Sequence, residues 1–193
     1  MRLVIASNNP KKRAEIAAIF NFPDIDIVPN EETTFVTVEE DEETFANNAR
    51  KKAEAFAKAN CCAALGDDSG LCVDALNGAP GVYSSRFAGV DADDASNNAK
   101  LLRELNGMRN RKAHFTCFIH IAFPDGQQFT GEGRVDGEIL KQSDGAAGFG
   151  YDPLFYCPEL KKTFAQASPE EKASVSHRGR ALRKLSEKLR AIA

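Results

Sequence analysis

Hydrophobic residues in the first third of the chain form short apolar runs separated by stretches with helical spacing. Residues 2–6 predict a strand and residues 11–20 a helix, because apolar side chains of the latter fall on one face. A second apolar run, residues 25–28, follows at the spacing of a strand–helix–strand unit. Helical spacing returns over residues 44–59, and residues 61–65 are predicted to form another strand, which ends in a polar turn.

The later part of the chain carries two long apolar segments and a final amphipathic helix. We predict a helix over residues 94–105, then strands over residues 113–123 and 128–140, joined by a turn at residues 124–126. One stripe of the last helix is expected to be buried: Ala181, Leu182, Leu185, Leu189 and Ile192. Helices that alternate with strands early, and a hairpin later, indicate an α/β fold with a mixed sheet.

Composition narrows the class of protein. The 193 residues suit one domain spanning residues 1–193, and a formal net charge of −3 argues against a nucleic-acid partner bound by broad phosphate neutralisation. No stretch approaches the ~18 apolar residues of a membrane span, and the first run is too short for a signal peptide. We therefore expect a cytoplasmic protein with no membrane partner. The five cysteines form no C-x-x-C pair and are expected to act as small hydrophobic side chains.

The first polar cluster, residues 7–12, lies between the first predicted strand and helix. A helix N-terminus has unpaired N–H groups and a positive dipole end, both of which attract phosphate. Ser7 and Asn9 can add hydrogen bonds and Lys12 a charge. The alternative is plain helix capping by serine or asparagine, with solvated lysines. The G-x-x-x-x-G-K phosphate loop is absent from the sequence.

The second and third clusters are acidic. Asp67 and Asp68 are adjacent carboxylates, which repel unless a cation or hydrogen bonds offset their charge. They can hold magnesium or activate water, and the alternative is a polar turn that includes Ser69. Residues 39–43 are all acidic, which usually marks a solvated surface, although one of them could share a metal with Asp68. Lys52, on the following helix, could reach phosphate or lie on the surface.

The fourth cluster lies in the C-terminal half. Residues 149–152 place aromatic rings beside glycine, which lets a flat base stack, and Asp152 can pair with ring N–H groups. Lys172, His177 and Arg178 can donate to a keto oxygen or to phosphate. Alternatively Ser176 caps the last helix and the two cations are exposed, although cations at a helix start need an anion nearby. These residues predict a magnesium-dependent enzyme or binder for a phosphorylated small molecule, and they do not identify the base.

The series of motifs resembles the inosine triphosphate pyrophosphatase family, also described as dITP/XTP or non-standard purine NTP pyrophosphatases. The motifs run nearly end to end: Ser7-x-Asn9-x-x-Lys12-x-x-Glu15, Thr44-Phe45 with Asn48-Ala49-x-x-Lys52-Ala53, Asp67-Asp68-Ser69-Gly70-Leu71, Gly78-Ala79-Pro80-Gly81-Val82-Tyr83-Ser84 with Arg86, Gly148-Phe149-Gly150-Tyr151-Asp152-Pro153, and Glu171-Lys172 with Ser176-His177-Arg178-Gly179. Each motif is weak alone, and all of them in this order are highly specific.

The resemblance implies a homodimer with a two-lobed α/β fold, a long mixed sheet with flanking helices, and an active-site cleft between the lobes. It implies hydrolysis of deaminated purine nucleoside triphosphates (ITP, dITP, XTP) to monophosphate and pyrophosphate with Mg²⁺. Asp68 is carried over as the catalytic carboxylate and as a magnesium ligand. The substrate-binding residues are expected to be Ser7, Asn8, Asn9, Pro10, Lys11, Lys12, Lys52, Ser69, Phe149, Gly150, Tyr151, Asp152, Lys172, His177 and Arg178.

Two positions depart from the family pattern. Residues 39–43 lack a glycine that many members have near position 42, which leaves the second magnesium ligand as Glu40 or Glu39. Asn8 stands where glycine is frequent. Two alternative functions remain: a pyrophosphatase for other modified nucleotides, such as pyrimidine triphosphates, and a nucleotide-binding sensor without turnover.

Overall fold

The computed structural model describes residues 1–20, 22 and 24–191. The chain divides into two compact units. The first comprises Met1–Asp68, Cys117–Gly133 and Arg178–Ala193, and the second Ser69–Thr116 and Arg134–His177. The sheet has the strand order β2-β1-β3-β4-β5-β6-β7. The predicted α/β class with a mixed sheet is confirmed, because β1 pairs in parallel with β2 and β3 while β5 pairs antiparallel with β6.

The N-terminal strand–helix–strand unit forms as the hydrophobic pattern predicts. β1 spans Arg2–Ala6, α1 spans Pro10–Ile19 with proline in its first turn, and β2 is limited to Asp26–Ile27. β2 is shorter than the predicted strand, and the chain continues into a 3₁₀ turn, η1, at Asn30–Glu32.

Helix α2, Phe45–Asn60, begins at Thr44, whose side chain accepts a hydrogen bond from the Asn47 backbone N–H. It packs very closely on β3, which spans Ala63–Val73. A Cβ atom added to Gly66 would lie 2.1 Å from the carbonyl oxygen of Ala49 on α2, so only glycine permits this approach. The close packing places one face of α2 directly against β3.

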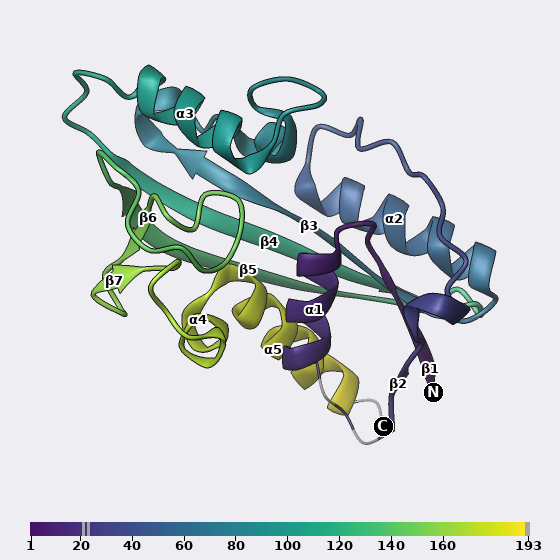
Figure 1. Ribbon diagram of the computed structural model, residues 1–193. Coiled ribbons are helices and arrows are strands. Elements are labelled where there is room, and N and C mark those ends of the chain that lie inside the picture. Colours follow the sequence, from purple (N-terminus) through teal and green to yellow (C-terminus); the bar gives the residue numbers. More distant parts are fainter. Residues whose placement is uncertain (21, 23, 192–193) are drawn as a thin grey trace. The chain divides into compact units, whose positions relative to one another are not determined.

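The strands of the first unit are covered on both faces. Leu3, Ile5 and Leu65 belong to a core that also contains Ile16 of α1 and Leu182 of α5, His177–Arg190. Alternate residues of the strands face the other side of the sheet, where they pack against α2 in a second core layer. This layer contains Val4, Ala6, Val28, Ala64 and Ala122 together with Ala53, Phe56 and Ala57 of α2. Figure 1 shows α1 and α5 on one side of these strands and α2 on the other.

The predicted end of the third strand is wrong. The sequence pattern predicts a strand at residues 61–65 followed by a polar turn, whereas β3 continues through the acidic pair as far as Val73. Extended backbone carries both carboxylates into the interior because buried cations compensate their charge, as described below. The turn interpretation of Asp67, Asp68 and Ser69 is therefore excluded.

The second unit contains the other ends of the long strands and several helical segments. Two 3₁₀ helices, η2 (Asp74–Leu76) and η3 (Gly81–Arg86), precede α3, Asp94–Glu104. β4 (Lys112–Ala122) and β5 (Gln128–Ile139) are neighbours in the sheet and confirm the predicted hairpin. A hydrogen bond from the Phe123 backbone N–H to the Gln127 carbonyl closes its turn.

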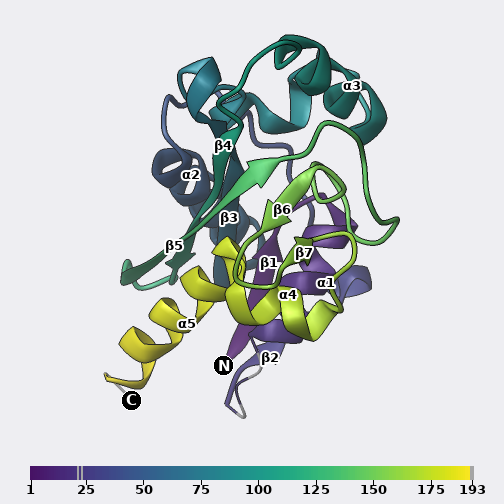
Figure 2. The ribbon, with the colours of Figure 1, turned by 90° about the vertical axis from the view of Figure 1, so that its left-hand side faces the viewer.

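Besides the two 3₁₀ helices, two short strands and one α-helix of the second unit were not predicted: β6 (Phe155–Cys157), β7 (Lys162–Thr163) and α4 (Pro169–Val175). Figure 2 shows α4 beside β6 and β7. Phe155 and Phe164 are fully buried in the core of this unit together with Phe115, Leu101 and Leu154. This core supports the segment that carries the fourth polar cluster.

The buried stripe predicted for the last helix is confirmed for the residues that the structure describes. In α5 the stripe of Ala181, Leu182 and Leu185 is buried and Leu189 is partly buried, as expected, and Ile192 lies outside the described residues. Among the helices that the structure describes, none is long and apolar enough to span a bilayer. The cleft between lobes and the action of residues 1–193 as one catalytic domain stay predictions.

Candidate functional site

Charged side chains gather inside the first unit on both faces of β3. We call this group the carboxylate–cation cluster. It consists of Lys12, Glu15, Glu40, Lys52, Asp67, Asp68 and Arg178. Buried charges are costly unless they are paired. The ion pairs and hydrogen bonds of each residue therefore indicate its chemical role.

Asp67 is the centre of one half of the cluster. Its carboxylate accepts from Arg178 Nε at 2.9 Å, pairs with Lys12 Nζ at 3.0 Å and accepts a hydrogen bond from Cys117 Sγ at 3.1 Å. Burial alone would raise the pKa of Asp67, but Arg178 and Lys12 outweigh it and hold the pKa well below its usual range. Asp67 is therefore a permanent anion that fixes two cations.

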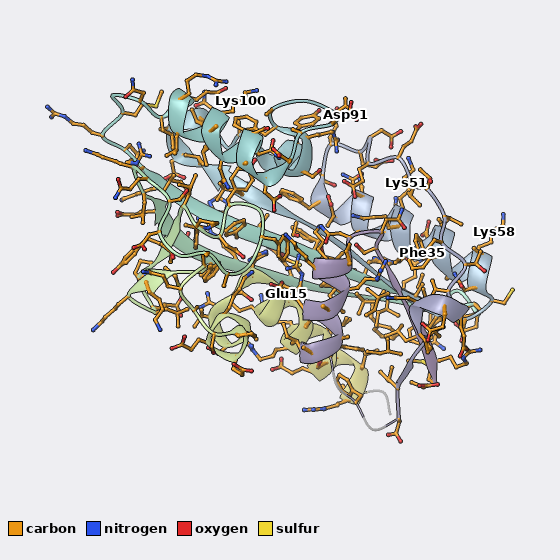
Figure 3. The ribbon with its side chains drawn as sticks, viewed as in Figure 1. Glu15, Phe35, Lys51, Lys58, Asp91 and Lys100 are labelled. Carbon is orange, nitrogen blue, oxygen red and sulfur yellow. The ribbon has the colours of Figure 1, made fainter. Side chains whose placement is uncertain are left out.

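Arg178 is the most buried cation of the cluster, at 1% exposure. Besides Asp67 it pairs with Glu15 of α1, which Figure 3 labels. Burial opposes its charge, and the two carboxylates overcome that and raise its pKa further. The anion that the sequence analysis required at the start of the last helix is thus supplied by the protein itself. Arg178 joins α5 to β3 and α1.

Asp68 is the centre of the other half. Lys52 Nζ donates to Asp68 Oδ1 at 3.0 Å and to Glu40 Oε1 at 2.8 Å, so one cation bridges two carboxylates. Burial raises the pKa of Asp68, partly offset by Lys52 and Lys12. Burial works against the charge of Lys52, but Asp68 and Glu40 raise its pKa overall. The Oδ2 atom of Asp68 is buried and has no hydrogen-bond partner among the described residues.

The acidic loop at residues 39–43 is attached to α2 by the buried amide of Asn48. The Glu42 backbone N–H donates to Asn48 Oδ1 at 3.2 Å, and Asn48 Nδ2 donates to the Glu42 carbonyl at 3.3 Å. This two-way bond directs Glu40 toward Lys52, whereas Glu39 is exposed. Of the two glutamates left open by the sequence, the geometry favours Glu40 as the partner of Asp68.

The donor set of this half fits magnesium. Mg²⁺ prefers carboxylate oxygens and usually binds one or two of them, with water and substrate phosphates completing its octahedron. The buried Oδ2 atom of Asp68, together with the carboxylate of Glu40, provides such a pair. Among the described residues, no group of three or more histidine, cysteine, aspartate and glutamate side chains is placed to hold a metal ion.

The N-terminus of α1 carries the first predicted cluster. Asn9 Oδ1 accepts from the backbone N–H groups of Lys11 and Lys12 at 2.9 and 3.2 Å, so the capping interpretation is confirmed for this side chain. Ser7 Oγ accepts from the Asn9 backbone N–H at 3.2 Å. Asn8, Asn9, Pro10 and Lys11 are exposed, whereas Lys12 turns inward to Asp67. Lys12 thereby connects the N-terminus of α1 to the carboxylate–cation cluster.

The second unit gathers the remaining predicted residues around three phenylalanines. We call this group the aromatic cluster: Phe115, Phe149, Asp152, Phe164, Lys172 and His177. Lys172 Nζ lies 2.6 Å from Asp152 Oδ2 and 4.8 Å from the centroid of the Phe149 ring. The same Asp152 oxygen accepts from the Phe149 backbone N–H at 2.9 Å. Phe149 is thus held beside a buried ion pair.

His177 is buried and stacks on Phe115, with centroids 4.7 Å apart and planes 12° from parallel. Tyr151 is buried as well, and its hydroxyl donates to the Ser84 carbonyl at 2.8 Å. Burial raises the pKa of the Tyr151 phenol, with a smaller contribution from Asp94. Flat rings beside buried donors are suited to binding a planar heterocycle.

The structure brings the predicted residues into two groups. Lys12, Lys52, Asp68, Glu40 and Arg178 meet in the first unit. Phe149 to Asp152, Lys172 and His177 meet in the second, and Ser69 follows Asp68 in β3, half-buried. That both groups line one cleft stays a prediction.

Three residues of these sites have no role in the sequence-based prediction: Glu15, Asn48 and Phe115. Glu15 and Asn48 appear there only as parts of motifs, and Asp67 is considered with Asp68 for magnesium or water, not as the partner of Arg178 and Lys12. Phe115 stacks on His177 from an unremarked apolar strand. Consecutive residues of a strand face opposite sides, but the turn predicted at Asp67 and Asp68 concealed this separation of their side chains. Nothing in the pattern indicated Phe115.

Known proteins resemble this chain over nearly its whole length. The sequence profile of the Ham1 family matches residues 3–188 of this chain. The dITP/XTP pyrophosphatase of Desulforamulus reducens is 53% identical over 190 residues, which cover 97% of this chain and 94% of that protein. The dITP/XTP pyrophosphatase of Bacillus anthracis is 46% identical, over 97% of this chain and 96% of that protein.

Solved structures agree with the sequence matches. The Ham1 protein of Staphylococcus aureus is 43% identical, with a TM-score of 0.89 and 100% of both chains covered. A HAM1 protein from Coxiella burnetii is 40% identical, with a TM-score of 0.89 and 99% of both chains covered. The profile match, the identities and the shared fold confirm the resemblance that the motifs indicated: this chain belongs to the Ham1 family.

Proposed function

We propose that this protein hydrolyses deaminated purine nucleoside triphosphates, namely ITP, dITP and XTP, to the nucleoside monophosphate and pyrophosphate, with Mg²⁺ as cofactor. The observation that carries the proposal is Asp68, a buried carboxylate held beside Glu40 by Lys52, in a chain whose relatives bear the name dITP/XTP pyrophosphatase.

Asp68 has the properties of a general base. Burial raises the pKa of Asp68, and a carboxylate with a raised pKa holds an accepted proton better than an exposed one does. In the proposed step, Asp68 accepts a proton from water while the water oxygen bonds to the α-phosphorus. The bond from that phosphorus to the oxygen bridging to the β-phosphate breaks, and pyrophosphate leaves with the electron pair.

Glu40 and Asp68 are the residues that would hold magnesium. When bound, Mg²⁺ supplies positive charge to the phosphate oxygens and disperses the charge that develops in the transition state. Lys52 keeps both carboxylates in place, and Lys12, oriented by Asp67, offers a second cation to the triphosphate. Ser7 and the N-terminus of α1 are proposed to make further phosphate contacts.

The aromatic cluster is proposed to bind the base. Phe149 offers a ring for stacking, and Lys172 and His177 offer donors to the 6-keto oxygen of hypoxanthine or xanthine. Adenine presents a 6-amino donor instead, so donor would meet donor. An unpaired buried polar group costs about 1–3 kcal/mol, and two mismatches amount to a preference of ~100-fold or more over ATP.

A substrate panel tests the proposal. ITP, dITP, XTP, GTP, ATP, dUTP and a methylated pyrimidine triphosphate are each incubated with the protein and Mg²⁺, and the products are identified by ion-exchange chromatography. We expect monophosphate and pyrophosphate, fastest from ITP, dITP and XTP, and no reaction in EDTA. Release of orthophosphate from ITP would contradict the proposed bond cleavage.

The same panel separates the two alternative functions. A pyrophosphatase for other modified nucleotides would cleave a pyrimidine triphosphate faster than ITP. A sensor would bind ITP without turnover, and Asp68→Asn would leave its behaviour unchanged. The relatives' shared name favours the purine substrate over both.

We further propose that the protein acts as a homodimer in the cytoplasm, as the family resemblance implies. Light scattering coupled to gel filtration measures the mass of the particle. A mass near twice the 21.0 kDa of the chain is expected. A particle of one chain that retains full activity would contradict the dimer.

A further inference from the structure

The first turns of α3 hold the backbone of Gly150 from both sides. Asp94 Oδ2 accepts the Gly150 N–H at 2.8 Å, and Asn98 Nδ2 donates to the Gly150 carbonyl at 2.9 Å. Residues four apart on a helix lie one above the other, so both side chains can hydrogen-bond to the backbone of the same residue. We call this pair of hydrogen bonds the α3 clamp.

The clamp acts on the segment that carries Phe149. The Gly150 N–H belongs to the peptide group that follows Phe149, and the Phe149 N–H, bonded to Asp152 Oδ2 at 2.9 Å, belongs to the peptide group that precedes it. With both neighbouring peptide planes held, the backbone torsions of Phe149 are set. The direction of its Cα–Cβ bond follows from them, and the ring that this bond carries contacts Lys172, with Nζ 4.8 Å from its centroid.

This segment has little rigidity of its own. Gly145, Gly148 and Gly150 all have positive φ angles, of 88°, 77° and 60°. Glycine backbones are the most permissive, so a free segment of this composition samples many conformations. Further along the segment, the Tyr151 hydroxyl bonds to the Ser84 carbonyl. External hydrogen bonds, rather than local propensity, therefore define where the Phe149 ring lies.

We propose that Asp94 and Asn98 are positioning residues that determine base selectivity by pre-setting the Phe149 ring. The inference rests on the proposed role of the aromatic cluster in binding the base. A ring fixed in advance stacks on a purine without ordering cost, and it keeps the base in register with the donors on Lys172 and His177. A loosened ring lets the base shift, which costs the matched base more than the mismatched one.

A purely structural role is the competing explanation, because Asp94 lies in the first turn of α3 and acidic residues there stabilise a helix. The chain contains a matched control. Asp93 is the N-cap of the same helix, and its carboxylate accepts from the Ser96 N–H at 2.8 Å. Asp93→Ala weakens the helix without removing a hydrogen bond to Gly150.

The experiment compares Asp94→Ala, Asp94→Asn, Asn98→Asp and Asp93→Ala with the unchanged protein. Asn98→Asp keeps the shape of the side chain and replaces its donor by an acceptor. Dissociation constants for ITP and ATP are measured by calorimetry in Ca²⁺, kcat and KM in Mg²⁺, and the urea midpoint confirms that each variant is folded.

We expect Asp94→Ala and Asn98→Asp to weaken ITP binding about tenfold and ATP binding about twofold, so that selectivity falls about fivefold. KM for ITP should rise by a similar factor while kcat changes less than about twofold, since uniform binding is lost rather than transition-state stabilisation. Asp94→Asn keeps an acceptor oxygen and should restore most of the selectivity. Asp93→Ala should lower the urea midpoint and leave the ratio of ITP to ATP affinity unchanged.

The proposal is overturned if Asp94→Ala leaves that affinity ratio intact, or if Asp93→Ala lowers it equally. Failure of the proposed function has a different signature, namely no pyrophosphate from ITP with the unchanged protein. In that event the affinity ratios alone decide: a preference for ITP that only the clamp variants lose supports the inference, and equal affinities in the unchanged protein overturn it.

Discussion

Asp67 and Asp68 are consecutive residues of β3, and their carboxylates pair with different cations on opposite faces of the strand. Asp67 bonds Arg178 and Lys12, and Asp68 bonds Lys52. Alternation along an extended strand removes the repulsion expected of adjacent acids. It also divides their tasks, because Asp67 has its pKa lowered by two paired cations while Asp68 has its pKa raised by burial.

Replacing Asp68 by asparagine should abolish turnover with little loss of binding. The amide keeps the shape of the side chain and cannot accept a proton, and loss of a general base typically lowers rates by about 10²–10⁴-fold. Single-turnover assays with ITP measure the rate, and calorimetry in Ca²⁺ measures affinity. A variant with a rate within about threefold of the unchanged protein would contradict the assigned role.

Replacing Asp67 by asparagine should mainly destabilise the fold. Arg178 would stay buried without one of its two carboxylate partners, and breaking a buried ion pair costs about 3–5 kcal/mol. The free energy of unfolding is measured in urea. Asp136→Asn is the control, since it removes an exposed pair with Arg134 that is worth about 0–1 kcal/mol. An equal decrease in the free energy of unfolding of the two variants would refute the structural role of Asp67.

The choice between Glu40 and Glu39 as magnesium ligand can be tested with two isosteric changes. Glu40→Gln should raise the Mg²⁺ concentration for half-maximal activity about tenfold or more, because Glu40 adjoins Asp68 through Lys52. Glu39→Gln removes the same charge from the same loop, and it should change the Mg²⁺ concentration for half-maximal activity less than about twofold. The reverse order of effects would reassign the ligand to Glu39.

Stability should fall as the pH is lowered through the histidine range. Burial lowers the pKa of His120, whose Nε2 atom is buried without a hydrogen-bond partner among the described residues, and Glu54 and Gln128 only partly oppose this. The unfolded chain, with a histidine pKa of about 6.5, then binds more protons than the folded one below that pH. The contribution of His120 to the free energy of unfolding is fully present above about pH 6.5. It is lost as the pH falls from there toward the lowered pKa of His120 in the folded protein.

Urea midpoints at pH 7.5, 6.5 and 5.5 measure this dependence. Over that window the carboxylates stay ionised in the unfolded chain, and the raised pKa of Asp68 in the folded protein acts in the opposite direction to the lowered pKa of His120. His114 contributes in the same direction as His120, since burial lowers its pKa as well. His120→Gln should therefore flatten the dependence without removing it. An unchanged slope in this variant would show that His120 is not the group responsible.

Long periodic elements were predictable because their own side chains define them. β1, α1, α2, β4, β5 and α5 follow from periodicity, caps and turn residues. β6 and β7 contain too few residues for a period to show. α4 was missed although Ser168 and Glu171 form a capping box, a signal that the sequence did contain.

The candidate site divides in the same way. Local sequence was enough to name Asp68, Lys12, Lys52 and Lys172 as candidates, because carboxylates and cations follow predicted elements there. The wrong turn at residues 66–70 shows the limit of that reasoning. Asp-Ser-Gly favours a turn locally, and a buried strand is stable here only because Arg178, 111 residues from Asp67 along the chain, compensates the charge.

The sequence by itself determined the fold class, the family and the residues that carry chemistry, because periodicity and motif order are local properties of the chain. Tertiary structure alone decided which groups pair: Asp67 with Arg178, Lys52 with both Asp68 and Glu40, and the Gly150 backbone with Asp94 and Asn98. Ion pairs and hydrogen bonds depend on distance in space, and residues far apart in sequence come within that distance only when the chain folds.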